Sequence, residues 1–228
     1  MRLTDIEHRV AAAGLAIRGG FHPEAADAVP AGPDGRPTST VVLIGNVDGS
    51  MWDAFAAAPE LHDGAPNALD RWTRRVVDGI AGAVGATALY PFRGPPYLPF
   101  QRWAMRAEPV APSPLGILIH PDYGLWHAYR GALAFAQPLD LPPRDARPSP
   151  CDSCRDKPCL TACPVGAFGD RGYDVPACIG HIAGPAGAAC MAGSCLARRA
   201  CPVGRAFTYG PPQSAYHMQA FLRSNRRP

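Results

Sequence analysis

Apolar side chains recur every three or four residues in two stretches of the chain, and this spacing predicts two amphipathic helices. The longer helix has Asn67 as its N-cap. Its apolar face consists of Leu69, Trp72, Val76, Ile80 and Val84. The shorter helix starts at Thr4–Glu7, which has the spacing of a capping box, and ends at Gly19–Gly20. Its apolar positions are Ile6, Val10, Ala13 and Ile17.

Short apolar runs bounded by turn residues predict the strands. Thr40–Ile44 is rich in β-branched residues, and a second strand is expected near Thr87–Tyr90. Two later runs, Leu115–His120 and Trp126–Ala136, flank the turn sequence Pro121-Asp122-Tyr123-Gly124 and predict a β-hairpin. Helices mixed with antiparallel strands predict an α+β fold.

Prolines are concentrated between residues 138 and 150, where neither a helix nor a strand is expected to continue. We therefore predict an N-terminal domain over residues 1–137 and a proline-rich linker over 138–150. A small cysteine-rich domain follows over 151–210, and residues 211–228 form a C-terminal tail.

Composition and charge narrow the function classes. The chain has 228 residues, of which 47% are hydrophobic, and a formal net charge of +3. It starts without an apolar signal core and has no run approaching the roughly 18 apolar residues of a membrane span, so we expect a cytoplasmic protein with no membrane contact. No basic stripe accompanies the charge, which argues against nucleic acid as a partner. In a reducing compartment, cysteines favour metal ligation over disulfides.

Eight cysteines lie between residues 151 and 201, in two groups that end in Cys163-Pro164 and Cys201-Pro202. This pattern resembles two-cluster ferredoxins, in which three cysteines of one motif share a [4Fe–4S] cluster with the Cys-Pro of the other. The resemblance assigns Cys151, Cys154, Cys159 and Cys201 to cluster I. It assigns Cys163, Cys178, Cys190 and Cys195 to cluster II.

The spacing departs from that family, because x4 replaces the usual x2 before the third cysteine and the second motif is stretched to x11, x4 and x5. The alternative is a pair of zinc sites, since zinc also takes four thiolates. The doubled Cys-Pro and the single Cys-x2-Cys pair favour clusters. Two clusters of about −2 each would bring the net charge of the loaded protein to about −1.

Residues 150–210 also resemble the ferredoxin module of epoxyqueuosine reductases, with Cys178-Ile179 at the place of that module's isolated cysteine. The N-terminal part has no counterpart of that enzyme's glycine- and lysine-bearing helix region or of its catalytic aspartate. Residues 88–131 instead resemble the CblC-type family of cobalamin-processing proteins. That match is carried by Ile119–Gly131, which reads IHPDYGLWHAYRG, and by the aromatic stretch Leu89–Phe92.

Both families are similar in fold to flavin-dependent nitroreductases and handle corrinoids. The resemblance therefore implies a nitroreductase-like domain that binds a base-off cobalamin through aromatic and basic side chains. Those expected to contact the corrinoid are Tyr90, Phe92, Tyr97, Phe100, His120, Trp126, Tyr129 and Arg130. Trp126 and Arg130 would share one face of a regular strand. A flavin in this domain rests on fold analogy alone.

Three functions stay open. The first is an iron–sulfur corrinoid reductase, an oxidoreductase that takes single electrons from a flavodoxin, ferredoxin or flavin reductase and passes them through two clusters to cobalt. The second is a ferredoxin-type electron carrier whose N-terminal domain docks a partner. The third is an epoxyqueuosine-reductase-like enzyme that uses cobalamin as its cofactor. His181, between two cluster II cysteines, is a candidate for tuning the potential of that cluster.

Overall fold

The computed structural model describes residues 2–170 and 172–226, which form a mixed α+β structure of two compact units. Unit 1 comprises Met1–Pro109 and His127–Ala146, and unit 2 comprises Val110–Trp126 and Arg147–Pro228. The predicted N-terminal domain, 1–137, thus loses Val110–Trp126 to the cysteine-bearing unit. The physical reason is a shared core in which Leu115, Ile119 and Leu125 pack with Ala197 and Cys201.

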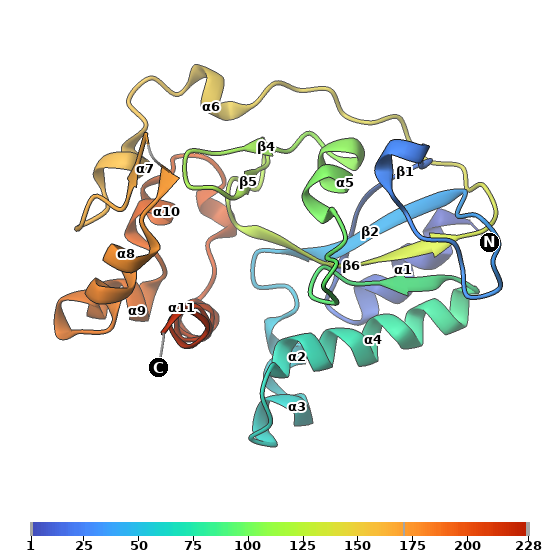
Figure 1. Cartoon of the computed structure of the whole chain (residues 1–228), viewed down its shortest axis with the longest axis horizontal. Helices are drawn as coiled ribbons and strands as arrows, with labels where there is room; N and C mark the ends of the chain where they lie inside the picture. Colours follow the sequence, from blue (N-terminus) through green and yellow to red (C-terminus); the bar gives the residue numbers. More distant parts are fainter. Residues whose placement is uncertain (1, 171, 227–228) are drawn as a thin grey trace. The chain divides into compact units, whose positions relative to one another are not determined.

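Unit 1 is built on a four-stranded antiparallel sheet (Figure 1). In spatial order the strands are β1 (Ala16–Phe21), β2 (Thr40–Val47), β6 (His127–Phe135) and β3 (Thr87–Leu89). The strands predicted at Thr40–Ile44 and near Thr87–Tyr90 are confirmed. Thr40–Ile44 is buried on both faces of the sheet, which explains why its sequence is a continuous apolar run rather than an alternating one.

Three helices of unit 1 pack on the sheet or on each other. They are α1 (Leu3–Ala12), α4 (Ala68–Val84) and α5 (Phe100–Ala107), and the short elements η1 (Ala25–Asp27), α2 (Trp52–Ala56) and α3 (Pro59–His62) lie in the connections. In Figure 1, α4 packs against β3 and β6, α1 against β1 and α4, and α5 against β1. Asn67 is the N-cap of α4, as predicted, although Val77 rather than Val76 is among the buried residues of this helix.

The shorter predicted helix is wrong in its second half. Helix α1 ends at Ala12, Gly14 adopts a left-handed φ of +73°, and Gly19–Gly20 lies in β1. The capping contact joins Asp5 to the backbone N–H of Arg2 at 3.0 Å instead of using Thr4–Glu7. Pairing with β2 satisfies the backbone groups of Ala16–Phe21, and this tertiary contact overrides the local helical pattern.

The predicted hairpin between Leu115–His120 and Trp126–Ala136 is also wrong. β6 pairs with β2 and β3, whereas β5 (Leu118–Ile119) pairs with β4 (Ala111–Pro112). Only a single bridge between His120 and Gly124 closes the turn. The first run lies in unit 2, whereas the second lies in unit 1 from His127 onward, so most of its apolar residues complete a different core.

Both edges of β2 meet a β-bulge near its middle. On β1, Arg18 and Gly19 together oppose the single residue Leu43. On β6, Arg130 is the extra residue, because Ile44 pairs with Gly131 while Gly45 pairs with Tyr129. A bulge breaks the alternation of side chains along a strand. The expectation that Trp126 and Arg130 share one face of a regular strand is therefore wrong, and Trp126 itself precedes β6.

Unit 2 consists of short helices and two small antiparallel pairs, β4-β5 and β7-β8. Its remaining elements are α6 (Pro150–Ser153), α7 (Pro158–Thr161), β7 (Phe168–Gly169), β8 (Gly172–Tyr173), α8 (Val175–Ile182), η2 (Pro185–Gly187), α9 (Ala188–Gly193), α10 (Leu196–Ala200), η3 (Arg205–Phe207) and α11 (Pro211–Asn225). Residues 138–149 form neither helix nor strand.

The predicted C-terminal tail contains helix α11, which packs against α8 and α9. Met218 from α11 joins a core cluster with Ile182 and Cys190. Residues 227 and 228 of the predicted tail lie outside the described residues. No single described helix is long and apolar enough to cross a membrane, and the one helix pair that reaches this length and composition, Val175–Ile182 with Pro185–Gly193, is bent by 98°.

Candidate redox centre

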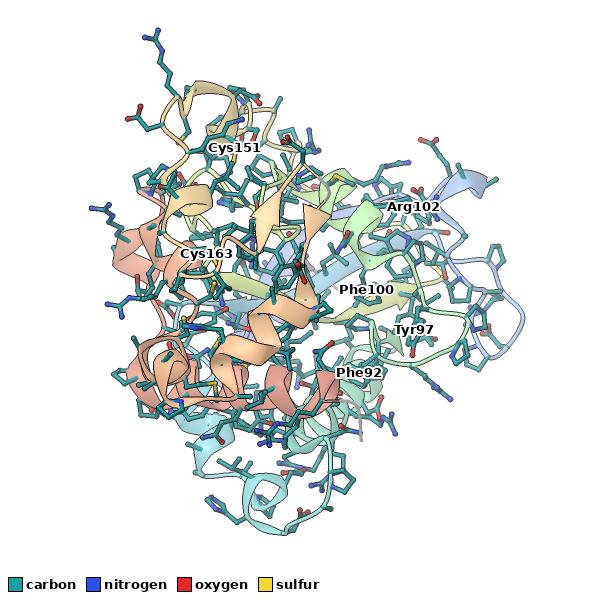
Figure 2. The ribbon with its side chains drawn as sticks, turned by 60° about the vertical axis from the view of Figure 1, so that its left-hand side comes forward. Phe92, Tyr97, Phe100, Arg102, Cys151 and Cys163 are labelled. Atoms are coloured by element: carbon teal, nitrogen blue, oxygen red, sulfur yellow. The ribbon has the colours of Figure 1, made fainter. Side chains whose placement is uncertain are left out.

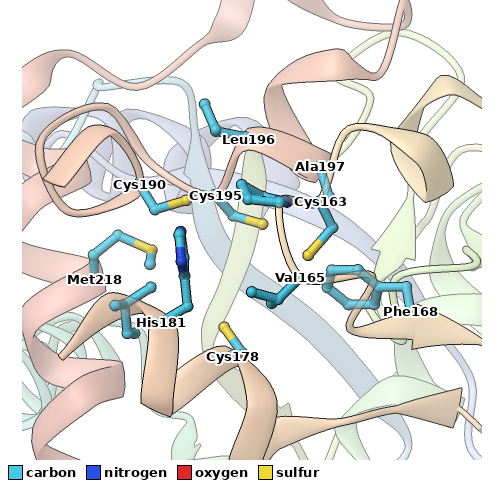
Figure 3. Close-up of a pocket in the computed structure, with 12 residues that line it drawn as sticks. Cys163, Val165, Phe168, Cys178, His181, Cys190, Cys195, Leu196, Ala197 and Met218 are labelled. Atoms are coloured by element: carbon cyan, nitrogen blue, oxygen red, sulfur yellow. The ribbon is translucent and has the colours of Figure 1, made fainter. Parts of the chain in front are cut away.

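Unit 2 contains two separate cavities, each bordered by four cysteines. Cavity I is lined by Pro114, Ile119, Pro150, Cys151, Cys154, Lys157, Pro158, Cys159, Cys201, Pro202 and Val203. Cavity II is lined by Cys163, Pro164, Val165, Phe168, Cys178, His181, Ile182, Cys190, Cys195, Leu196, Ala197 and Met218 (Figure 3). Each encloses about 310 Å³ of space free of protein atoms, part of which is open to solvent.

The two sets of cysteines are the sets that the sequence pattern assigns to clusters I and II. Electrostatic repulsion between the thiolate forms gives the same grouping. After burial, the charges that Cys154, Cys159 and Cys201 would carry also raise the pKa of Cys151. In the other cavity, Cys178 interacts with Cys163 and Cys190, and Cys195 interacts with Cys190 and Cys178. Ligation of clusters by these residues stays a prediction.

Prolines set the positions of the cysteines around cavity I. Pro150 begins α6 and Pro158 begins α7, so Cys151 and Cys159 each lie at the second position of a helix. Later in the sequence, Cys201 is the C-cap of α10, and Pro202 prevents the helix from continuing. Because the helices are short, their cysteines come from different directions toward one space.

Each sequence motif contributes cysteines to both cavities. Helix α7 carries Cys159 of cavity I, and Cys163 of cavity II follows the end of this helix. Helix α10 has Cys195 of cavity II as its N-cap and Cys201 of cavity I as its C-cap. This crossing of the chain corresponds to the arrangement expected from the two Cys-Pro sequences.

The donor chemistry of both cavities fits an iron–sulfur cluster. All eight cysteines are free thiols. Within the described residues, no three His, Cys, Asp or Glu side chains converge closely enough to hold one metal ion. Zinc requires four thiolates at about 2.3 Å from a single point, whereas thiolates of a [4Fe–4S] cluster surround a larger group. Both groups take four thiolates, so the choice between a cluster and zinc stays a prediction.

Burial of the thiols has an electrostatic cost when nothing neutralises them. Burial raises the pKa of Cys151, Cys159 and Cys201 in cavity I. It also raises the pKa of Cys178 and Cys195 in cavity II. Desolvation disfavours a bare thiolate, so binding of iron would release protons from these groups.

Hydrogen-bond donors lie beside several sulfur atoms. The backbone N–H of Ala167 donates to Cys163 Sγ at 3.4 Å, and the hydroxyl of Tyr173 hydrogen-bonds to Cys178. The ring of Tyr173 also stacks between those of Phe168 and Phe221, at centroid distances of 4.5 and 6.1 Å. These rings put apolar surface beside cavity II, which reduces access of water to the sulfurs.

The segment 110–126 forms part of cavity I through Pro114 and Ile119. Its turn crosses the segment Cys201–Gly204 so closely that a Cβ on Gly124 would overlap the carbonyl oxygen of Val203. A Cβ on Gly204 would likewise overlap the carbonyl of Tyr123. Glycine at both positions is therefore required by the crossing of two backbones.

His120 stabilises this turn. Its Nδ1 accepts hydrogen bonds from the backbone N–H groups of Asp122 and Tyr123, at 3.0 and 3.3 Å. The imidazole also stacks on the ring of Tyr123, with centroids 4.3 Å apart. These contacts within the turn account for the buried histidine without a ligand.

Trp126 lies in a cation–π stack in unit 2 and is only 1% exposed. The guanidinium of Arg198 lies 4.3 Å from the Trp126 ring centroid and 4.6 Å from that of Tyr209. Arg198 also donates two hydrogen bonds to the carbonyl oxygen of Leu125, at 3.1 and 2.5 Å. Arg198 was not predicted from the sequence, where its position between Cys195 and Cys201 is its only signal.

The other aromatic candidates lie on the proline-rich loop 90–99 and on α5 of unit 1, where Figure 2 labels three of them. Tyr90 donates a hydrogen bond to Asp78 at 2.6 Å and stacks on Phe92. Phe100 is buried against Trp103. Tyr97 is 66% exposed.

Tyr129 belongs to a buried polar network at the centre of unit 1. Arg18, which is 1% exposed, makes a two-pronged ion pair with Glu108 at 2.9 and 2.8 Å. The hydroxyl of Tyr129 donates to the same carboxylate at 2.6 Å, and burial together with this negative neighbour raises the pKa of the phenol. Arg130 contacts Asn46 Oδ1 at 3.4 Å and faces the charge of Asp70.

The eight residues expected to hold a corrinoid are therefore divided. His120 and Trp126 belong to unit 2, whereas the other six belong to unit 1. Tyr90, Phe100 and Tyr129 already have intramolecular contacts that orient them. These contacts do not favour the predicted corrinoid set as one binding surface.

Comparison of the sequence with models of protein families gives no match. A search among curated proteins also finds no matching sequence.

Proposed function

We propose that this protein transfers single electrons through two [4Fe–4S] clusters, one held in each cavity of unit 2. The observation that carries the proposal is the division of eight cysteines into two sets of four, each around its own apolar space. The chain crosses between the two cavities, as it does in two-cluster ferredoxins.

The residues around the cavities have separate tasks in this function. Cys151, Cys154, Cys159 and Cys201 would hold one cluster, and Cys163, Cys178, Cys190 and Cys195 would hold the other. The clusters supply the one-electron chemistry, and the protein binds them, limits water and supplies hydrogen-bond donors to sulfur. Tyr173 and the backbone N–H of Ala167 serve the last task in cavity II.

Metal and sulfide analysis of anaerobically prepared protein tests this proposal. The expected result is about eight iron and eight acid-labile sulfide per chain, with broad visible absorption that bleaches on reduction. Cys151→Ala and Cys201→Ala should perturb the same paramagnetic signal, and Cys178→Ala should perturb the other. Stoichiometric zinc without labile sulfide would refute the proposal.

For the electron acceptor we propose a corrinoid, which would make the protein a cobalamin reductase. The structural observation in favour is Tyr97, an exposed aromatic side chain on the proline-rich loop of unit 1. The second support is the resemblance of Ile119–Gly131 to cobalamin-processing proteins. Most of the other residues expected to contact the corrinoid have intramolecular partners.

Titration of the loaded protein with cob(II)alamin tests the acceptor. A base-off site shifts the cobalamin absorbance to shorter wavelength, and Tyr97→Ala should weaken this response. Ile117→Ala, which also removes an exposed apolar side chain, serves as the control. An unchanged spectrum at saturating protein would favour the electron carrier, with unit 1 docking a protein partner.

A further inference from the structure

We propose that His181 donates a hydrogen bond to a sulfur atom of the cluster in cavity II and thereby raises the reduction potential of that cluster. This inference rests on the proposed function, because it requires a cluster in the cavity. It concerns how the protein sets the energy of one electron at one of its two sites.

Among the described residues that line cavity II, His181 alone has a side chain with an N–H or O–H group. The other lining residues are cysteines, Pro164, Met218 and residues with aliphatic or aromatic hydrocarbon side chains. Tyr173 reaches Cys178 from outside this lining. His181 is partly buried, and a hydrogen-bond acceptor within the apolar space would offset the desolvation of its imidazole.

Helix geometry directs His181 toward the sulfurs. It lies three residues after Cys178 on α8, and residues at this spacing are neighbours on one helix face. Figure 3 shows its imidazole at one edge of the space that the four cysteine sulfurs surround.

The imidazole is available for such a contact. The backbone carbonyl of His181 accepts hydrogen bonds from the N–H groups of Gly184 and Ala183. Across residues 2–170 and 172–226, no described group forms a hydrogen bond with its ring nitrogens. A neutral imidazole has one N–H, so the donor needs no change of protonation state.

A hydrogen bond to sulfur changes the balance between the two redox states. Reduction adds one electron and therefore one negative charge to the cluster. A donor beside sulfur stabilises the more negative state more strongly, so the potential increases. In cavity I the only nitrogen-bearing side chain is that of Lys157, which is exposed and therefore hydrated and screened.

Redox titration followed by paramagnetic resonance of both clusters tests the role of His181. His181→Leu removes the donor while keeping an apolar side chain of similar size. At a fixed ambient potential, we expect the ratio of reduced to oxidised cluster II to fall about tenfold, which is 59 mV for a one-electron couple. His181→Gln restores an N–H and should recover most of the loss. Cluster I provides the internal control and should not shift.

Two results overturn the inference while leaving the proposed function intact: an unchanged potential of cluster II in His181→Leu, or an equal shift in His181→Leu and His181→Gln. If His181→Leu does not retain cluster II, pulsed resonance of the wild-type protein with isotopically labelled histidine decides the matter. Coupling between histidine nitrogen and the reduced cluster II supports the contact, and its absence refutes it. Failure to find iron and sulfide in the wild-type protein would instead refute the proposed function.

Discussion

Gly166 and Gly204 occupy the same place in two copies of Cys-Pro-Val-Gly, and both have a left-handed backbone, with φ of +58° and +72°. Their surroundings differ. A Cβ on Gly166 would meet no atom within 4 Å, whereas a Cβ on Gly204 would overlap the carbonyl of Tyr123. Replacing each glycine by alanine therefore separates the effect of backbone conformation from the effect of the close crossing.

Left-handed conformation costs alanine about 1–2 kcal/mol at either position. Only Gly204→Ala must also displace the turn at Tyr123, and such overpacking adds about 1–3 kcal/mol. Taking about 2 kcal/mol for the added term, local opening of this turn should become about thirtyfold more frequent than in Gly166→Ala. The prediction is confined to the segment that crosses Gly204.

Hydrogen exchange of the peptide spanning residues 118–126 measures this difference. The backbone N–H groups of His120 and Gly124 are held by mutual hydrogen bonds of 2.8 and 2.9 Å, and both should exchange faster in Gly204→Ala. Gly166→Ala should exchange there at the wild-type rate. Equal protection of this peptide in the two variants would show that the crossing does not hold the turn.

Three further predictions concern stability. Arg18→Ala should lower the free energy of unfolding by about 3–5 kcal/mol, because Glu108 keeps a buried charge without its partner. The control is Arg36→Ala, which breaks the exposed ion pair with Asp34. A comparable loss of stability in urea unfolding of the control would contradict this reasoning. Ser194 has φ +75° and ψ 165°, a backbone region that favours glycine. Ser194→Gly should therefore raise the free energy of unfolding by about 1–2 kcal/mol. A lower urea midpoint in this variant would count against backbone strain at Ser194. Burial raises the pKa of the cavity thiols in cluster-free protein, so the folded state retains protons that the unfolded state loses. The free energy of unfolding should therefore decline as pH rises above the ordinary thiol pKa of about 8.5. A urea midpoint that increases over that interval would have the wrong sign.

The sequence predicted the local features whose signal lies within a few residues. Thr40–Ile44 is a buried strand and Asn67 begins the longest helix, because apolar spacing and capping act locally. The grouping of cysteines around the two cavities is the one that the resemblance to two-cluster ferredoxins implies, while ligation of clusters stays a prediction. These parts depend little on how distant segments meet.

Features that depend on distant segments were not predictable. Ile17 follows a helical spacing, yet it lies in a strand because β2 offers a pairing edge. The bulge at Arg130 depends on the register between β6 and β2. Arg198 is one of many arginines in the sequence, and only folding brings Trp126 and Tyr209 to its two sides. The contribution of Met218 to cavity II likewise depends on the docking of α11.

The five-residue helix α10 has a consequence for how the protein would acquire its clusters. Its ends are the cysteines Cys195 and Cys201, which belong to different cavities. At a rise of 1.5 Å per residue, these ends lie roughly 9 Å apart and cannot be positioned independently. Insertion of one cluster would fix one end of the helix and thereby pre-order a ligand of the other. Maturation should therefore be cooperative, with half-loaded molecules scarce, and oxidative loss of one cluster should hasten loss of its neighbour.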